Sequence, residues 1–150
     1  TVQGYYQSFE FDNGANDTDS GDQYGIGAQY RFGAFRVAGN YGMADVDNPG
    51  GGSVEHTGWQ LGGGMKLGTG ELLLSYIHQE TDVAGDPEAD TWGIAYVHPL
   101  SKRTNLYASY GQTDNDNGGT FGVNYSQSAV NTVTPNSTPK AFVVGVRHLF

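Results

Sequence analysis

The chain ends in Phe142-Val143-Val144-Gly145-Val146-Arg147-His148-Leu149-Phe150, and this stretch decides the fold. Alternate residues divide it into a largely apolar face that finishes on Phe150 and a mixed face that carries Gly145 and Arg147. Period-two alternation predicts a β-strand. A last strand that runs to a terminal aromatic residue is typical of bacterial outer-membrane β-barrels, where the aromatic side chain lies in the interfacial girdle.

The composition is that of one aromatic, glycine-rich domain, which we expect to span residues 1–150. Glycine accounts for 24 of 150 residues, tyrosine for 10 and proline for 5, and there is no cysteine and so no disulfide or thiolate metal site. The mean hydropathy is −0.48, and no apolar run approaches the roughly 18 residues of a membrane helix. This does not exclude a membrane barrel, because alternating strands dilute their own apolar signal. The net charge of −9 argues against a nucleic acid partner.

Eight stretches alternate with period two, and their connections are of two kinds. We expect strands at 2–12, 23–33, 34–46, 57–67, 71–82, 90–98, 104–113 and 140–150. The connections after the odd strands are long and polar, and those after the even strands are tight turns. Long loops at one end and short turns at the other distinguish outer-membrane barrels from a soluble β-sandwich, which is the alternative. The predicted fold is all-β, an antiparallel transmembrane β-barrel wall of eight strands.

Aromatic residues gather near the ends of the predicted strands, as interfacial girdles require. We expect one ring at the periplasmic end and one nearer the outside. Residues assigned to the periplasmic ring are Tyr30, Phe32, Phe35, Tyr96 and Phe150, and those assigned to the outer ring are Tyr41, Trp59, Tyr76, Trp92 and Tyr110.

The face opposite the apolar one is built largely from small residues such as Gly25, Gly27, Gly62 and Gly64. Side chains fill the interior of an eight-stranded barrel, whereas sixteen to eighteen strands leave an aqueous channel. Glycines would leave voids in an eight-stranded barrel, and voids are costly. The chain therefore indicates half of a wider wall, as a fragment or as one chain of a two-chain barrel. A closed eight-stranded monomer is the alternative.

Two motifs in the last three strands carry a family resemblance. Leu100-Ser101-Lys102-Arg103-Thr104-Asn105-Leu106-Tyr107-Ala108-Ser109-Tyr110 and the ending Gly145-Val146-Arg147-His148-Leu149-Phe150 resemble the C-terminal part of Gram-negative trimeric general porins. Earlier strands share only the architecture. The resemblance implies a sixteen-stranded pore in the outer membrane, a chain about twice this length, and a trimer. No stretch here resembles the constriction loop of such porins, which comes from their N-terminal half.

Four basic residues share the phase of the small-residue face: Arg31, Arg36, Lys66 and Arg147. The Gly33-Ala34 turn sets Arg31 opposite Arg36, an arrangement of like charges that is tolerable where the side chains face water. Charges in the lumen of a barrel tune its selectivity. We expect all four to point into the pore near its periplasmic end and to favour anions. The alternative is that they only keep the interior wet.

Acidic residues cluster in four segments, 12–22, 45–55, 80–90 and 114–116, which hold fourteen of the sixteen carboxylates. In the first, Asp17, Asp19 and Asp22 resemble a calcium loop, but the terminal bidentate Glu is missing, which favours a solvated loop. We expect no other cofactor. Histidines on separate strands and the lack of a G-x-S-x-G elbow predict that the chain is not an enzyme.

The expected function is passive diffusion of small hydrophilic solutes and ions through a water-filled channel in the outer membrane. Its expected partners are membrane lipid and lipopolysaccharide, the other half of the barrel, and homologous subunits of a trimer. The competing hypotheses are a closed eight-stranded structural or adhesive barrel and a soluble calcium-binding β module.

Overall fold

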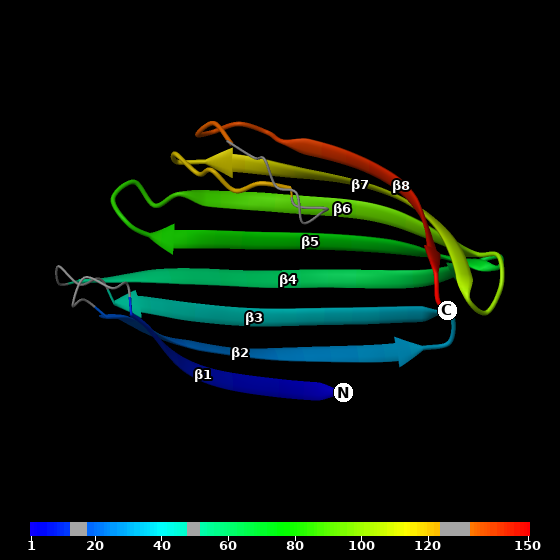
Figure 1. Ribbon diagram of the computed structural model, residues 1–150, viewed down its shortest axis with the longest axis horizontal. Coiled ribbons are helices and arrows are strands. Elements are labelled where there is room, and N and C mark those ends of the chain that lie inside the picture. The colour runs from blue at the N-terminus through cyan, green and yellow to red at the C-terminus, as the bar shows by residue number, and fades with distance from the viewer. Residues whose placement is uncertain (13–17, 48–51, 124–132) are drawn as a thin grey trace.

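The computed structural model describes residues 1–12, 18–47, 52–123 and 133–150 as one antiparallel sheet (Figure 1). Its strands are β1 (Val2–Asp12), β2 (Thr18–Phe32), β3 (Phe35–Asp47), β4 (Ser53–Leu67), β5 (Gly70–Asp82), β6 (Glu88–Pro99), β7 (Thr104–Asp116) and β8 (Lys140–His148). Within these residues, no helix has the length and apolar character needed to cross a membrane.

The eight strands follow one another as a meander, and the sheet is curved but open. Among the described strands, β1 pairs only with β2 and β8 only with β7. A closed eight-stranded barrel requires β1 to pair with β8, so this alternative is wrong for the structure. The prediction of an all-β antiparallel wall that forms part of a wider barrel is confirmed.

The C-terminus and the three tight connections lie at one end of the sheet, and the N-terminus lies part-way along the sheet on the edge strand β1 (Figure 1). The two-residue turns begin with Gly33 (φ 57°) and Gly68 (φ 62°). Glycine adopts this left-handed conformation without steric cost, which explains why the strands reverse here. We call this the turn end, and the opposite end, which carries the longer connections, the loop end.

The strands extend further toward the loop end than the sequence indicated. β2 begins at Thr18 rather than at 23, β4 at Ser53 rather than at 57, and β7 continues to Asp116. The residues in these extensions are mostly polar, so they show no period-two alternation of hydropathy. The backbone hydrogen bonds of the sheet continue through them because they do not depend on side-chain polarity. One consequence is a row of acidic residues directly opposite one another on β2 to β5: Asp22, Asp45, Glu55 and Asp82.

The final strand is shorter than predicted, since β8 ends at His148 and not at Phe150. The neighbouring strand β7 begins at Thr104, so residues after His148 have no strand partner there. The Leu149 N–H donates instead to the Arg103 carbonyl, in the turn between β6 and β7, at 2.9 Å. Phe150 is fully exposed, and its ring makes an edge contact with the His148 ring at 4.9 Å between centroids.

The sheet is a single layer, and its two faces differ. Large apolar side chains are exposed along one face, for example Ile26 (58%), Leu61 (54%) and Val144 (66%). Ala89 is the one buried apolar residue among those described. A soluble β-sandwich would bury its apolar face against a second sheet. With no second sheet in the described structure, the apolar face fits a lipid environment, and the soluble β alternatives find no support.

Aromatic pairs lie on the apolar face at two levels. Near the turn end, the Phe32 ring stacks on Tyr30 and on Phe35, at 5.9 and 5.6 Å between centroids. Nearer the loop end, Trp59 packs on Tyr76 and Trp92 on Tyr110, each at 5.3 Å. These two levels have the arrangement that interfacial girdles require. Tyr96 lies at the turn-end level beside His98.

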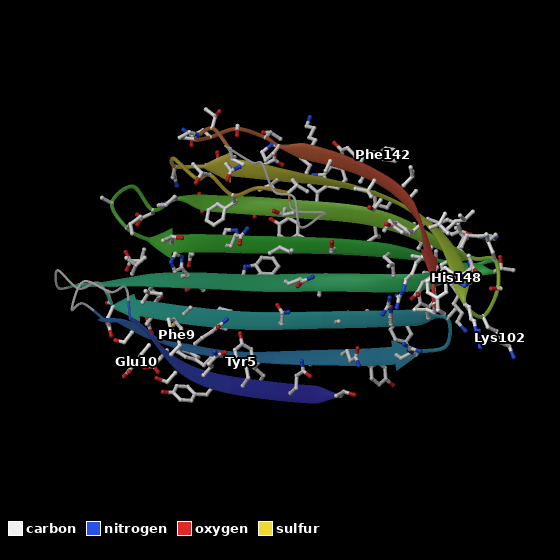
Figure 2. All side chains as sticks on the ribbon, in the orientation of Figure 1. Tyr5, Phe9, Glu10, Lys102, Phe142 and His148 are labelled. Atoms are coloured by element: carbon white, nitrogen blue, oxygen red, sulfur yellow. The ribbon has the colours of Figure 1, made fainter. Side chains whose placement is uncertain are left out.

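The opposite face, which we call the polar face, uses its glycines to accommodate aromatic rings. Tyr5 and Phe9 project from β1 over the neighbouring strand (Figure 2). A Cβ on Gly25 would lie 2.8 Å from the Tyr5 ring and 2.8 Å from the Tyr41 carbonyl oxygen. Tyr107 lies over Gly145 in the same way. Part of the small-residue pattern thus makes room for rings that lie flat on the sheet.

Gly25→Ala should therefore lower the free energy of unfolding by about 1–3 kcal/mol, the usual cost of overpacking. Urea titration in lipid vesicles, followed by tryptophan fluorescence, measures it. Gly63→Ala is the matched control, since its Cβ would have only an ordinary contact of 3.7 Å with the Arg36 carbonyl oxygen. Equal stability of the two variants would contradict this account of the polar face.

Candidate functional site

Three of the four predicted basic residues lie together on the polar face at the turn end. Arg31 is opposite Arg36 on β2 and β3, as predicted. Both line one pocket with Lys66 and with an acid, Glu71. The cluster therefore carries three positive charges and one negative charge, a net charge of about +2 at neutral pH.

Glu71 is the residue that sequence reasoning missed. Arg36 Nε lies 2.8 Å from Glu71 Oε1, and both side chains are about 40% exposed (41% and 39%). A Cβ at Gly64 would lie 2.6 Å from Arg36 Nε, so this glycine leaves the space in which the pair forms. At this exposure the ion pair contributes less than about 1 kcal/mol. The signal was present in the sequence, since the tight turn after Leu67 sets Lys66 opposite Glu71.

Arg147 does not join this cluster. It lies on β8 opposite Asn105 of β7, at the turn end and in the phase of the polar face. Five strand spacings separate β8 from β3, or about 24 Å along the sheet. The structure therefore places the four bases at one end of the wall but brings only three of them together.

Carboxamide side chains occupy the middle of the polar face. Gln3, Gly27, Asn40 and Gln60 are consecutive cross-strand partners from β1 to β4 and form one row. Asn40 Nδ2 donates to Gln60 Oε1 at 3.4 Å. Sequence reasoning attached no function to these amides, because hydropathy alternation does not separate an amide from any other polar side chain.

Asn115 holds the connection between β7 and β8 against the polar face. Its side chain is only 4% exposed. Nδ2 donates to the carbonyls of Phe121 (3.0 Å) and Ser137 (2.9 Å), and Oδ1 accepts from the Phe121 N–H (2.7 Å). One carboxamide thus bonds to both described arms of the connection. Because Phe121 lines one pocket together with residues of β1 to β5, this pocket lies on the concave side of the sheet.

The calcium hypothesis rested on three aspartates, and the structure describes the side chain of one of them, Asp22. Asp17 and the side chain of Asp19 lie outside the described residues. Asp22 is part of β2, and its Oδ1 accepts a hydrogen bond from the Tyr6 hydroxyl at 2.7 Å. Within the described ranges, no three His, Asp or Glu side chains are grouped to bind a metal. A calcium site at the acidic loops stays a prediction.

The four histidines lie at separate places on the sheet, each beside a different neighbour. His56 contacts the Thr81 hydroxyl (2.9 Å), His98 that of Thr69 (3.4 Å) and His148 that of Thr104 (2.9 Å). His78 Nδ1 lies 2.8 Å from Asp90 Oδ1, which also accepts from the Tyr76 hydroxyl at 2.7 Å. The contacts of His56, His78 and His148 join neighbouring strands, and that of His98 joins β6 to the turn between β4 and β5.

Comparisons with known proteins agree with this geometry. A family described as Gram-negative porin matches residues 1–118. Outer membrane porin protein 32 of Delftia acidovorans is 29% identical over 130 residues, which are 86% of this chain and 37% of that protein. The solved anion-selective porin from Comamonas acidovorans has a TM-score of 0.82 and 26% identity, over 95% of this chain and 48% of that one. The chain therefore spans less than half the length of these relatives.

The matched region complements the sequence motifs. The family match covers the strands that resembled porins only by architecture and also the first motif, residues 100–110, whereas the ending at residues 145–150 lies outside it. The partial coverage of both relatives agrees with the expectation of a half-barrel.

Asn115→Ala should release the segment 117–123 from the polar face. Loss of three hydrogen bonds, together worth roughly 2 kcal/mol, should speed amide exchange of Phe121 about thirtyfold. Hydrogen–deuterium exchange of the folded protein measures this rate. Gln112→Ala, on the other face of β7, is the control and should leave the rate unchanged. Unchanged exchange in Asn115→Ala would show that the connection is held by other contacts.

Proposed function

Because this chain belongs to the Gram-negative porin family, we propose that it forms half of the wall of a water-filled channel for the passive diffusion of small hydrophilic solutes and ions. Its location is the outer membrane, in agreement with the family and with the name of the curated relative. The other half of the wall comes from a further part of the same polypeptide or from a second chain.

The single-layer sheet carries this proposal. One face exposes large apolar side chains between two aromatic levels, and the other carries amides, glycines and charges. Such a wall is stable when lipid covers the first face and water the second. The unpaired edges of β1 and β8 require further strands, because unpaired backbone groups are not tolerated in lipid. A wall of sixteen strands would leave an aqueous channel.

Further partners follow from the same faces. Membrane lipid would contact the apolar face, lipopolysaccharide would contact its loop-end margin, and homologous subunits of a trimer would cover part of it. The relatives of this chain are porins, which supports the expectation that the chain is not an enzyme.

Anion preference is the selectivity that the basic cluster supports. Arg31, Arg36 and Lys66 outweigh Glu71 on the polar face. Charges separated by more than about 8 Å are largely screened at physiological salt, so this cluster acts on ions that pass close to the wall. The acidic residues at the loop end lie too far along the strands to cancel it. The related solved structure is described as an anion-selective porin.

Protein extracted from outer membranes should give large, stable conductance steps in planar lipid bilayers, as expected of an open aqueous pore. Heat-denatured protein is the control and should give none. Silence of the folded protein across many insertions would refute the channel. The intact masses of the chain and of any co-purifying partner identify how the barrel is completed.

Charge substitutions in the cluster should shift ion selectivity in opposite directions. One charge at about 8 Å in water is worth about 0.5 kcal/mol, or roughly a twofold change in ion occupancy. Arg31→Ser/Arg36→Ser should therefore lower the anion-to-cation permeability ratio about fourfold, and Glu71→Gln should raise it about twofold. Reversal potentials under a salt gradient measure the ratio.

Lys102→Ser is the matched control, since it removes a positive charge from the turn between β6 and β7 (Figure 2). It should leave the ratio close to that of the wild type. If the double substitution also leaves the ratio unchanged, the two arginines are structural and the proposed selectivity is wrong.

A further inference from the structure

A pocket on the polar face is lined by an unusual concentration of carboxamides: Gln3, Gln23, Asn40, Gln60 and Gln79. We call it the carboxamide pocket. Gly27, Gly42 and Gly58 also line it, so that its floor is close to the backbone. Four adjacent strands contribute these amides and a fifth contributes Gln79, in a register fixed by the ladder.

These amides have most of their hydrogen-bonding capacity free. A carboxamide offers two donors and one acceptor oxygen with two lone pairs. Asn40 and Gln60 share one long bond of 3.4 Å, and Gln23 donates to the Tyr5 hydroxyl at 3.4 Å. Within the described part of the chain, the Gln3 and Gln79 side chains make no hydrogen bond. The pocket therefore presents several donors and acceptors to whatever occupies it.

The lining is almost free of charge. Among the described residues of the pocket there is no Lys or Arg. Glu80 lies in the phase of the apolar face, and the His56 ring contacts the Thr81 hydroxyl at 2.9 Å. Arg31 of the basic cluster is four residues along β2 from Gly27, or about 13 Å. At that distance the cluster is largely screened from the pocket.

Phe121 is one of the aromatic residues that line this pocket, together with Tyr5, Tyr41 and Trp59. It belongs to the connection between β7 and β8, and the Asn115 side chain bonds both its N–H and its carbonyl. The buried side chain of Asn115 on β7 therefore holds the Phe121 backbone in place. Phe121 lines the same pocket as residues of β1 to β5.

We propose that the carboxamide pocket is a binding subsite for neutral polyhydroxylated solutes such as sugars, an inference that rests on the proposed channel function. Sugar hydroxyls both donate and accept hydrogen bonds, which matches the mixed capacity of carboxamides. The apolar C–H face of a sugar ring matches the flat apolar surface of Phe121. An anion would find no arginine or lysine here.

Maltose titration of single channels in planar bilayers tests the subsite. Wild-type current should fall saturably as maltose concentration rises. Asn40→Ala/Gln60→Ala should weaken the apparent affinity about tenfold, the effect of losing one or two hydrogen bonds. Phe121→Ala, outside the strands, is a second variant and should also weaken it. Asn105→Ala removes an amide of the polar face outside the pocket and should leave the affinity unchanged.

The outcomes separate the subsite from the channel. Conducting channels with no saturable maltose effect, or with equal affinity in the wild type and the double variant, would refute the subsite alone. Stronger block by gluconate than by maltose would also overturn it, because the pocket would then recognise anions. Absence of conductance would refute the channel and the subsite together.

Discussion

Backbone hydrogen bonding in a medium without water is the constraint on which this structure depends. In lipid each N–H and C=O must find a partner, which leaves a continuous sheet as the form that this strand-rich chain can take. The ladder then fixes the register, and the register decides which side chains are neighbours. The Arg31–Arg36 opposition, the row from Gln3 to Gln60 and the stacked Phe32 and Phe35 rings all follow from it.

Because side chains alternate along each strand, one face of the sheet contacts lipid and the other carries the polar residues. The apolar face contributes its affinity for lipid without any second layer, so that stability does not require a conventional core. Residues of the polar face therefore do not have to form a packed core, and many of them can be glycines. Glycines beneath Tyr5 and Tyr107 let aromatic rings lie against the backbone, and Gly64 leaves room for the ion pair of Arg36 and Glu71.

Much of this fold could be predicted from the sequence because its determinants are local. Period-two alternation and tight glycine turns are short-range signals, and they correctly predicted eight strands and the opposition of Arg31 and Arg36. Strand ends were misjudged where polar residues continue the ladder. Glu71 could be found from turn geometry, whereas the contacts of Asn115 could not, because they join residues up to 22 positions apart without any periodic pattern.

The acidic row at the loop end has a consequence for the conditions under which the protein is stable. Asp22, Asp45 and Glu55 are directly opposite one another on adjacent strands, and like charges in this position repel. Dissolved cations relieve such repulsion through screening. The loop-end rim should thus tighten as the ionic strength of the surroundings rises, while the lipid-covered part of the same strands remains insensitive to salt.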